Sequence, residues 1–387
     1  MLPKTKPRLE SVFDFRRGVS ILEPRPGIIA VVKNICLFAV SLMLSFLLCE
    51  VIVRTFFPQH INPHLVRDSG FGIRDNEPNT LAHHLSPGEY NVDISTNSDG
   101  LRGAKNYDRT PPAGTRRIAI LGDSYAFGYG CNDDQVVSAV LENDLNDAPP
   151  VGGRKSEVLN FGVSGYGQSE ELILYRNKTR LYHPDTVILF YFENDIGNNV
   201  VADIFTLGKD GQVEPTGKSY LPGTTAEQRM YTVPPLRWFF LYSQFWNLLR
   251  NQLSALVQRH SLDQVGLKSY NDGNAYGVAL TRGLLLALSR EVKSDGARFI
   301  IFIIPNNNDP TTSNFPFTKT EWQALGMTVV DGRNVVDSSD YFVRDGHWRP
   351  SGHRKAAQTL KPMLLEEVSQ VPNSYMSQHA SISKSLR

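Results

Sequence analysis

One serine and one histidine, far apart in the chain, have the neighbours that acyl transfer requires. The apolar run 118–121 leads into Gly-Asp-Ser124, which indicates a buried strand whose carboxyl end presents the Ser124 hydroxyl. Near the C-terminus, Asp345-Gly-His347 offers a histidine that can take the serine proton and a carboxylate beside it. We therefore predict a nucleophilic site in which Ser124 attacks, His347 is the base and Asp345 orients the imidazole.

Acyl transfer also needs hydrogen-bond donors where negative charge develops on the substrate. Two further polar segments, 160–167 and 192–195, follow predicted strands. We expect the backbone N–H groups of Ser124 and Gly165 and the side-chain amide of Asn194 to form this oxyanion hole. Glycine at position 165 lets the backbone approach a substrate closely.

Each of these segments also has a purely structural interpretation. Ser124 alone could cap a helix that follows the strand, and Asn194 and Asp195 could cap a turn. The glycines of the segment 160–167 could serve only a tight strand-to-helix turn or, less well, a phosphate cradle. The order of the segments at successive strand ends favours a serine-hydrolase site. Asp340 is the alternative acid and His353 the alternative base.

Short apolar runs rich in β-branched residues alternate with helical patterns, as in parallel sheets buried on both faces. We expect strands at Arg117–Leu121, Val158–Phe161, Thr186–Phe192, Arg298–Ile304 and Met327–Val330. We expect helices at Asp134–Leu145, Ser169–Leu181, Ala275–Lys293 and Ser351–Val368. This order predicts an α/β fold: a doubly wound, mostly parallel sheet sandwiched by helices with right-handed crossovers.

The segments at the strand ends resemble the conserved blocks of the SGNH (GDSL-type) serine hydrolase family, in the family's order, from roughly Arg117 to Leu364. The resemblance implies a flavodoxin-like fold and an esterase site. The residues that match the family's nucleophile, oxyanion-hole donors, acid and base are Ser124, Gly165, Asn194, Asp345 and His347. Tyr125 departs from the usual Leu, and the acid and base are one residue apart where many members separate them by two.

An apolar segment over residues 34–54 is close to the roughly 20 residues that a membrane-spanning helix needs. Seven basic residues precede or start it, whereas only Arg54 follows closely, which predicts a cytoplasmic N-terminus and an extracytoplasmic, periplasmic remainder at the inner membrane. A cleaved signal peptide is the main alternative, disfavoured by the long basic region and the lack of a clear cleavage site. A buried core helix is disfavoured because no amphipathic stripe is visible.

The predicted organisation has six parts. They are a basic N-terminus at 1–33, an anchor at 34–54, an extension at 58–115, a hydrolase domain at 116–370, an insertion within it at 201–274 and a disordered tail at 371–387. The extension contains an alternating stretch, Tyr90, Val92 and Ile94, that predicts a strand, and we expect it to pack on the catalytic domain. The aromatic stripe of the insertion favours a helix on the domain's own surface over a lid.

Composition excludes several classes of function. A net charge of +1 implies no strong field for nucleic acid. Cys36 and Cys49 lie in the apolar segment, so Cys131 is left without an intradomain disulfide partner. The pair His83-His84 has no companion at zinc-ligand spacing, and no nucleotide-binding fingerprint is present. We therefore expect neither a metal nor a cofactor.

Three functions fit this sequence. The first is a membrane-anchored esterase that removes acyl groups, most plausibly acetyl, from a carbohydrate or another ester. The second is a polysaccharide O-acetyltransferase, in which a sugar hydroxyl receives the acyl group from the same acyl-enzyme. The third is a catalytically silent glycan-binding or scaffold protein of the cell envelope, which the complete set of site residues disfavours. Polysaccharide-export or biosynthesis proteins, which the resemblance to membrane-anchored bacterial members suggests, are the candidate partners.

Overall fold

A computed structural model describes residues 26–63, 65–149, 153–224, 239, 241–253, 267–306, 308–311 and 313–366. The predicted tail at 371–387 and most of the predicted N-terminal region lie outside the described residues, as does Trp238 at the start of the aromatic stripe. The chain divides into two compact units, Met1–Ile52 and Val53–Arg387.

The first unit contains most of helix α1 (Pro26–Phe56), which is longer than the predicted anchor. Its stretch Ala30–Phe56 is long and apolar enough to cross a membrane. Apolar side chains such as Phe38 and Leu42 are exposed along it. A signal sequence near an N-terminus passes the same test of length and composition.

The second unit is built on a five-stranded parallel sheet with the order β11-β10-β7-β5-β6. Its strands are β5 (Thr115–Gly122), β6 (Lys155–Asn160), β7 (Thr186–Tyr191), β10 (Arg298–Ile303) and β11 (Thr328–Asp331). All five predicted strands are therefore confirmed. Numbered within the sheet, the order is 2-1-3-4-5, that of flavodoxin-like folds, in which ligands bind at the switch point between the first and third strands. Here that point lies between β5 and β7.

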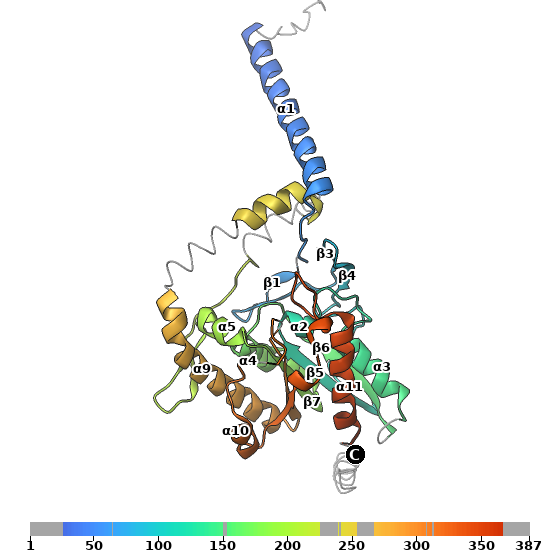
Figure 1. The fold of residues 1–387 in the computed structure, drawn as a ribbon, viewed down its shortest axis with the longest axis vertical. Coiled ribbons are helices and arrows are strands. Elements are labelled where there is room, and N and C mark those ends of the chain that lie inside the picture. The colour runs from blue at the N-terminus through green and yellow to red at the C-terminus, as the bar shows by residue number, and fades with distance from the viewer. Residues whose placement is uncertain are drawn as a thin grey trace, which may run out of the picture. The chain divides into compact units, whose positions relative to one another are not determined.

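Four long helices cover the sheet: α3 (Val137–Asp147), α4 (Gln168–Asn177), α9 (Leu267–Ser294) and α11 (Pro350–Glu366). Successive residues of a strand point to opposite faces. Ile118 and Ile120 of β5 accordingly share one buried cluster with α3 and α11, while Ala119 and Leu121 share another with α4 and α9. Figure 1 shows these two pairs of helices on opposite sides of the sheet. The predicted doubly wound α/β fold is confirmed.

The predicted extension forms two small antiparallel sheets, β1 (Val66–Asp68) with β2 (Arg74–Asn76), and β3 (Leu81–Ser86) with β4 (Tyr90–Ser95). The strand expected at Tyr90, Val92 and Ile94 is confirmed, and these three side chains are buried. They pack against later parts of the unit, since Tyr90 and Val92 contact Phe342 and Ile94 lies in a cluster with Phe127.

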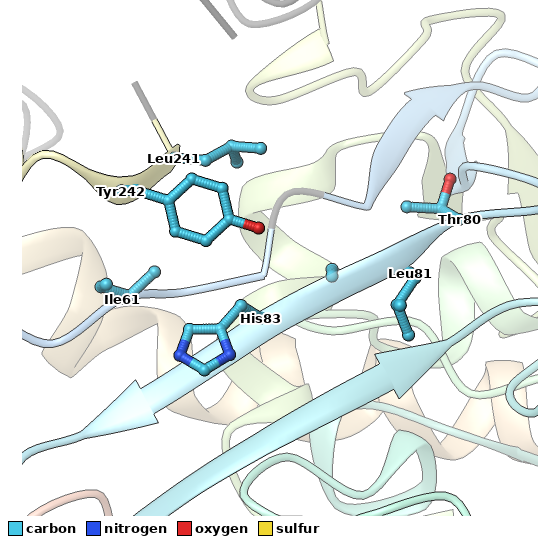
Figure 2. A pocket seen from close by; sticks show the side chains of 7 residues that line it. Ile61, Thr80, Leu81, His83, Leu241 and Tyr242 are labelled. Carbon is cyan, nitrogen blue, oxygen red and sulfur yellow. The ribbon is translucent and has the colours of Figure 1, made fainter. Parts of the chain in front are cut away.

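Helix α5 (Asp195–Ala202) leads into the insertion. The insertion then forms a hairpin of β8 (Phe205–Leu207) and β9 (Val213–Pro215), which packs on α9. Residues 244–253 are helical. Just before them, Leu241 and Tyr242 line a small hollow together with Ile61 and His83, as Figure 2 shows. This part of the insertion therefore lies against β3 of the extension.

Candidate active site

The strand β5 ends at Gly122, and the next residues present Ser124 in a sharp turn. Gly122 has a φ of 146°, and a Cβ there would lie 2.7 Å from the Cβ of Ala126, so the close approach requires glycine. Asp123 caps the four-residue helix α2 (Ser124–Phe127) by accepting a backbone N–H through its carboxylate. Ser124 is therefore the first residue of this helix and not its capping residue.

The three residues predicted to form the catalytic triad are linked in a row by two hydrogen bonds, with His347 in the middle. The Ser124 Oγ atom lies 2.7 Å from His347 Nε2, and His347 Nδ1 lies 2.8 Å from Asp345 Oδ2. Because an ionised carboxylate only accepts, Nδ1 carries a proton and Nε2 is left to accept from the serine hydroxyl. This is the arrangement in which the imidazole can act as a general base.

The environment of Asp345 keeps its carboxyl group charged. Burial raises the pKa of Asp345, but the hydrogen bond and charge of His347, with His60 and His84 nearby, outweigh burial and hold it below its usual range. The Asp345 and His347 side chains are 10% and 20% exposed. The pair is therefore sheltered but still reachable by a substrate.

A tight turn fixes the position of the histidine. The Phe342 N–H donates to the His347 carbonyl at 2.8 Å, and the Gly346 N–H donates back to the Phe342 carbonyl at 2.9 Å. Gly346 has a φ of 80°, which favours glycine. The Trp348 side chain that follows is fully buried between the sheet and α11. The turn is thus anchored on both sides of His347.

The loop after β6 is held against the turn that carries Ser124. The Val163 N–H donates to the Gly122 carbonyl at 3.1 Å, and the Asn160 side chain donates to the Ala126 carbonyl at 2.7 Å. Gly165 follows in this loop with a φ of 72°. Within the described residues, the backbone N–H groups of Ser124 and Gly165 have no hydrogen-bond acceptor. Both donors remain available to a substrate oxygen.

Asn194 lies where the chain leaves β7, at the start of α5, and its side chain is exposed. It makes no capping hydrogen bond to that helix, so the capping interpretation fails for Asn194. Its side chain lies near the Asp123 carboxylate; burial raises the pKa of Asp123, and the neighbouring Asn194 amide opposes the rise. The amide therefore lies beside the turn that carries Ser124.

The alternative acid and base have other partners. His353 is fully buried in α11, where its Nδ1 atom accepts from the Val137 N–H at 3.3 Å, and burial lowers its pKa to about 3. The buried Asp340 carboxylate accepts from the Asp337 N–H at 2.9 Å and from Lys355 at 2.6 Å. These contacts hold the final helix in place. His347 is therefore the histidine that contacts Ser124.

Sequence reasoning missed the residues that the extension brings to the site. The Arg74 side chain donates to the Gly165 carbonyl at 2.8 Å. On the other side of the site, the Asp345 N–H donates to Glu89 at 3.1 Å, and His60 and Tyr90 lie beside the Asp345 carboxylate. No sequence signal connects these residues to the site, because their separation from it along the chain is long.

The described residues contain no group of three or more His, Cys, Asp or Glu side chains that could hold a metal ion. The histidines nearest to the serine are engaged with one another, with Asp345 and with neighbouring aromatic rings. The groups that can take part in chemistry at this site are the side chains of Ser124, His347 and Asp345 and the backbone N–H groups of Ser124 and Gly165.

No protein-family model matches the chain, and no curated protein matches it. Several solved structures do. A lipase/acylhydrolase from Enterococcus faecalis is 14% identical, with 65% of this chain and 97% of that chain covered and a TM-score of 0.38. An acetyl-xylooligosaccharide esterase from Geobacillus, crystallised as a mutant, is 12% identical, with 67% and 97% covered and a TM-score of 0.36.

A putative lipolytic protein of the G-D-S-L family from Desulfitobacterium hafniense is 12% identical, with 63% of this chain and 99% of that chain covered and a TM-score of 0.35. Likenesses this weak say nothing about activity. The strand order of the sheet and the polar segments at its carboxyl edge are features of the chain itself. They give it the doubly wound, flavodoxin-like fold that its sequence predicts.

Proposed function

We propose that this protein is a serine esterase that cleaves carboxylic esters through a covalent acyl-enzyme. The observation that carries the proposal is the continuous contact from Ser124 Oγ to His347 Nε2 at 2.7 Å and from His347 Nδ1 to Asp345 at 2.8 Å. A serine hydroxyl is a weak nucleophile unless a neighbouring base removes its proton. His347 is placed to do so, at the switch point of the sheet.

In the first half of the reaction, His347 takes the Ser124 proton as Oγ attacks the ester carbonyl carbon. The carbonyl oxygen becomes an oxyanion, which accepts hydrogen bonds from the N–H groups of Ser124 and Gly165 and from the Asn194 amide. His347 then returns the proton to the leaving alcohol as the ester C–O bond breaks. In the second half, His347 deprotonates a water that attacks the acyl carbon, and the acid is released as Ser124 regains its proton.

The substrate class we propose is an acylated carbohydrate, with acetyl as the acyl group. The support is the sequence pattern Asn97–Gly103 ahead of the Gly-Asp-Ser124 turn, which resembles membrane-anchored bacterial members of the SGNH family. The segment Asn97–Gly103 is fixed beside the loop after β6, since the Arg102 N–H donates to the Asn160 carbonyl at 3.1 Å. An O-acetyltransferase would use the same acyl-enzyme, with a sugar hydroxyl in place of water.

We further propose that α1 anchors the protein in the inner membrane with residues 1–33 in the cytoplasm and the hydrolase domain, residues 116–370, in the periplasm. The apolar helix and the basic residues before it support this orientation. A phosphatase reporter fused after Arg387 should be active only outside the cytoplasm. Activity of a cytoplasmic reporter at the same position would overturn the orientation.

The activity is tested with the full-length protein in detergent and a fluorophosphonate probe, which reacts with activated serines. We expect labelling at Ser124, located by peptide mass spectrometry, and loss of labelling in Ser124→Ala. Short acyl esters and an acetylated polysaccharide then report hydrolysis, and added oligosaccharide reports transfer. A folded protein that neither reacts with the probe nor cleaves any acyl ester would rule the proposal out.

A further inference from the structure

We propose that the helix over residues 244–253, in the insertion, lies on the bilayer surface and buries its apolar side chains in the lipid. The protein then contacts the membrane twice, through α1 and through this helix. The inference goes beyond the esterase activity, and it rests on one part of the proposed function, the membrane anchor.

The polar and apolar faces of this helix are reversed. The side chains of Ser243, which precedes the helix, and of Gln244 and Asn247 are buried on one face. On the opposite face, Leu249 is 48% exposed and Leu253 is 63% exposed. A helix on a water-exposed surface buries its apolar stripe and turns its polar residues outward. This helix does the opposite, which indicates an apolar medium on its outer side.

Aromatic residues continue the outer face toward the start of the helix. Phe245 lies four residues before Leu249 and shares its face, with the half-buried Trp246 beside it. Tyr242, just before the helix, is exposed. Trp and Tyr are enriched where a membrane meets water, because each ring is apolar and carries one polar group. The helix has a single charged residue, Arg250, so its contact with lipid is mainly apolar.

Hydrogen bonds tie the start of the helix to the chain at the end of the membrane span. The Arg54 side chain donates to the Tyr242 carbonyl at 2.8 Å, and the Gln59 N–H donates to the Gln244 side chain. The span itself ends at Phe56. If α1 crosses a bilayer, these two bonds hold the start of the helix at the bilayer surface.

The helix is fixed at its first turn by its own capping bonds. The Trp246 N–H donates to Ser243 Oγ at 3.0 Å, and Asn247 Nδ2 donates to the Ser243 carbonyl at 2.8 Å. A serine at this position satisfies an N–H that the start of a helix leaves without an intrahelical partner. The exposed leucines are therefore held in a regular helix and present one surface.

A bilayer fits this surface better than a second copy of the chain does. Ten helical residues are about 15 Å long and about 10 Å wide, so one side of the helix offers on the order of 150 Å². A stable protein–protein interface buries roughly 1,000 Å² or more. Lipid adapts its shape to a small apolar face, and α1 already tethers the helix beside it at a high effective concentration.

The helix is joined to the active site through the β3–β4 hairpin. The His83 ring of β3 lies 6.3 Å from the Tyr242 ring, centroid to centroid, across the hollow in Figure 2. The Glu89 carboxylate, in the hairpin turn, accepts the Asp345 N–H at 3.1 Å and the Arg344 N–H at 2.7 Å. A helix fixed on the bilayer therefore also limits how far the catalytic acid stands from the membrane.

The test measures the depth of single labels in the full-length protein, reconstituted in phosphatidylcholine vesicles. A thiol-reactive fluorophore is attached to Leu249→Cys in a Cys36→Ala, Cys49→Ala background, in which the buried Cys131 remains. Lipids with a nitroxide near the headgroup should quench this label by roughly half or more, because an interfacial helix sinks its apolar face ~5–10 Å into the boundary. Iodide in the water should quench it little. Leu253→Cys should give the same result.

Leu325→Cys is the matched control. Leu325 is 45% exposed, close to the value for Leu249, and it directly follows α10 (Lys319–Ala324). Figure 1 shows α10 at the opposite end of the second unit from the yellow helix that contains Leu249. A label at position 325 should be quenched by iodide and not by lipid. The inference is overturned if the label at position 249 responds as the control does. Protection from both quenchers would also overturn it, because that result indicates contact with protein, such as a second copy.

A label on the native Cys36, with Cys49→Ala, separates this inference from the proposed anchor. If lipid quenches the label at Cys36 while iodide quenches the label at position 249, the anchor stands and the surface contact fails. If lipid quenches only the label at position 249, the anchor fails and the surface contact stands. Turnover of a short acyl ester by the same proteins reports the esterase proposal separately, since none of the labelled positions lies in its site.

Discussion

The Tyr125 hydroxyl donates a 2.7 Å hydrogen bond to the Gly346 carbonyl oxygen. This bond joins the residue after the nucleophile to the residue before the base, across more than half of the chain. The Tyr125 ring also lies 5.0 Å from the His347 ring, centroid to centroid. Tyrosine at this position, where the SGNH pattern usually has leucine, therefore links the two halves of the site.

Tyr125→Phe should lower kcat about tenfold, because it releases the turn that holds His347 by removing one neutral hydrogen bond. The melting temperature should fall by only a few degrees, since the ring still packs against Trp348. Turnover of a short acyl ester, with unfolding followed by circular dichroism, measures both. Unchanged turnover in this variant would mean that the turn is held without the Tyr125 hydroxyl.

Asn194→Ala should reduce kcat by roughly 10² to 10³ and leave the fold intact, as expected for the loss of one oxyanion donor. Asn198→Ala is the matched control on the same helix, because the Asn198 side chain donates to the Tyr166 carbonyl at 3.2 Å. The control should keep nearly full turnover. Equal losses in the two variants would indicate a general disturbance of α5 and remove Asn194 from the oxyanion hole.

His347→Ala should abolish ester turnover, since no other base then reaches Ser124. Asp345→Asn should be less damaging, because the acid only orients and stabilises the imidazole. His353→Gln keeps an acceptor for the Val137 N–H and should retain turnover while losing stability. The three variants are compared by turnover after circular dichroism confirms folding. If His353→Gln lost ester turnover while His347→Ala retained it, the assignment of the base would be reversed.

The sheet and the core of the site could be predicted because their signals are local in the sequence. Runs such as 299–303 are apolar without alternation, as buried parallel strands must be, and Ser124 comes three residues after the apolar run 118–121. Parallel strands bring their carboxyl ends to one edge, so the polar segments after β5, β6 and β7 had to meet there. The fold then followed from the order of the elements.

Helix boundaries were less predictable, because packing decided them. The predicted helix Ala275–Lys293 begins earlier, at Leu267, and runs through a stretch rich in Asn, Asp and Gly. Gly277 within it allows a close approach to α5, since a Cβ there would lie 2.9 Å from Ile196. The predicted helix Ser169–Leu181 instead ends at Asn177, and a short 3-10 turn follows.

The contribution of the extension could not be predicted at all. His84 was considered only as a metal ligand with its neighbour His83, because spacing along the chain was the available criterion. Its contact with Tyr90 depends on the register of the β3–β4 hairpin. The contact of that hairpin with Asp345 joins positions 256 residues apart. A single sequence carries no periodic or local signal for a contact of that kind.

Behind the nucleophile, Glu171 lies fully buried near three other carboxyl groups, which predicts an unusual dependence of stability on pH. Its pKa is raised well above the usual range by burial and then by Asp195, Asp123 and Glu170. Burial likewise raises the pKa of Glu170 to about 7 from its ordinary value of 4.5. The folded pKa values exceed the unfolded ones, so the folded state holds these protons more tightly.

The stability that these two groups contribute is therefore fully present below pH 4.5 and is lost as the pH rises. For Glu170 the loss falls between pH 4.5 and about 7. For Glu171 the loss extends to higher pH, because its pKa is raised well above the usual range. Glu171→Gln keeps the shape of the side chain and removes the proton equilibrium. We expect its melting temperature to equal that of the wild type near pH 5 and to exceed it at pH 8 by roughly 2 to 4 °C. Glu214→Gln, on the exposed strand β9, is the control and should show no such difference. A melting temperature at pH 8 equal to or below that of the wild type would show that Glu171 is stabilised as a carboxylate by its surroundings.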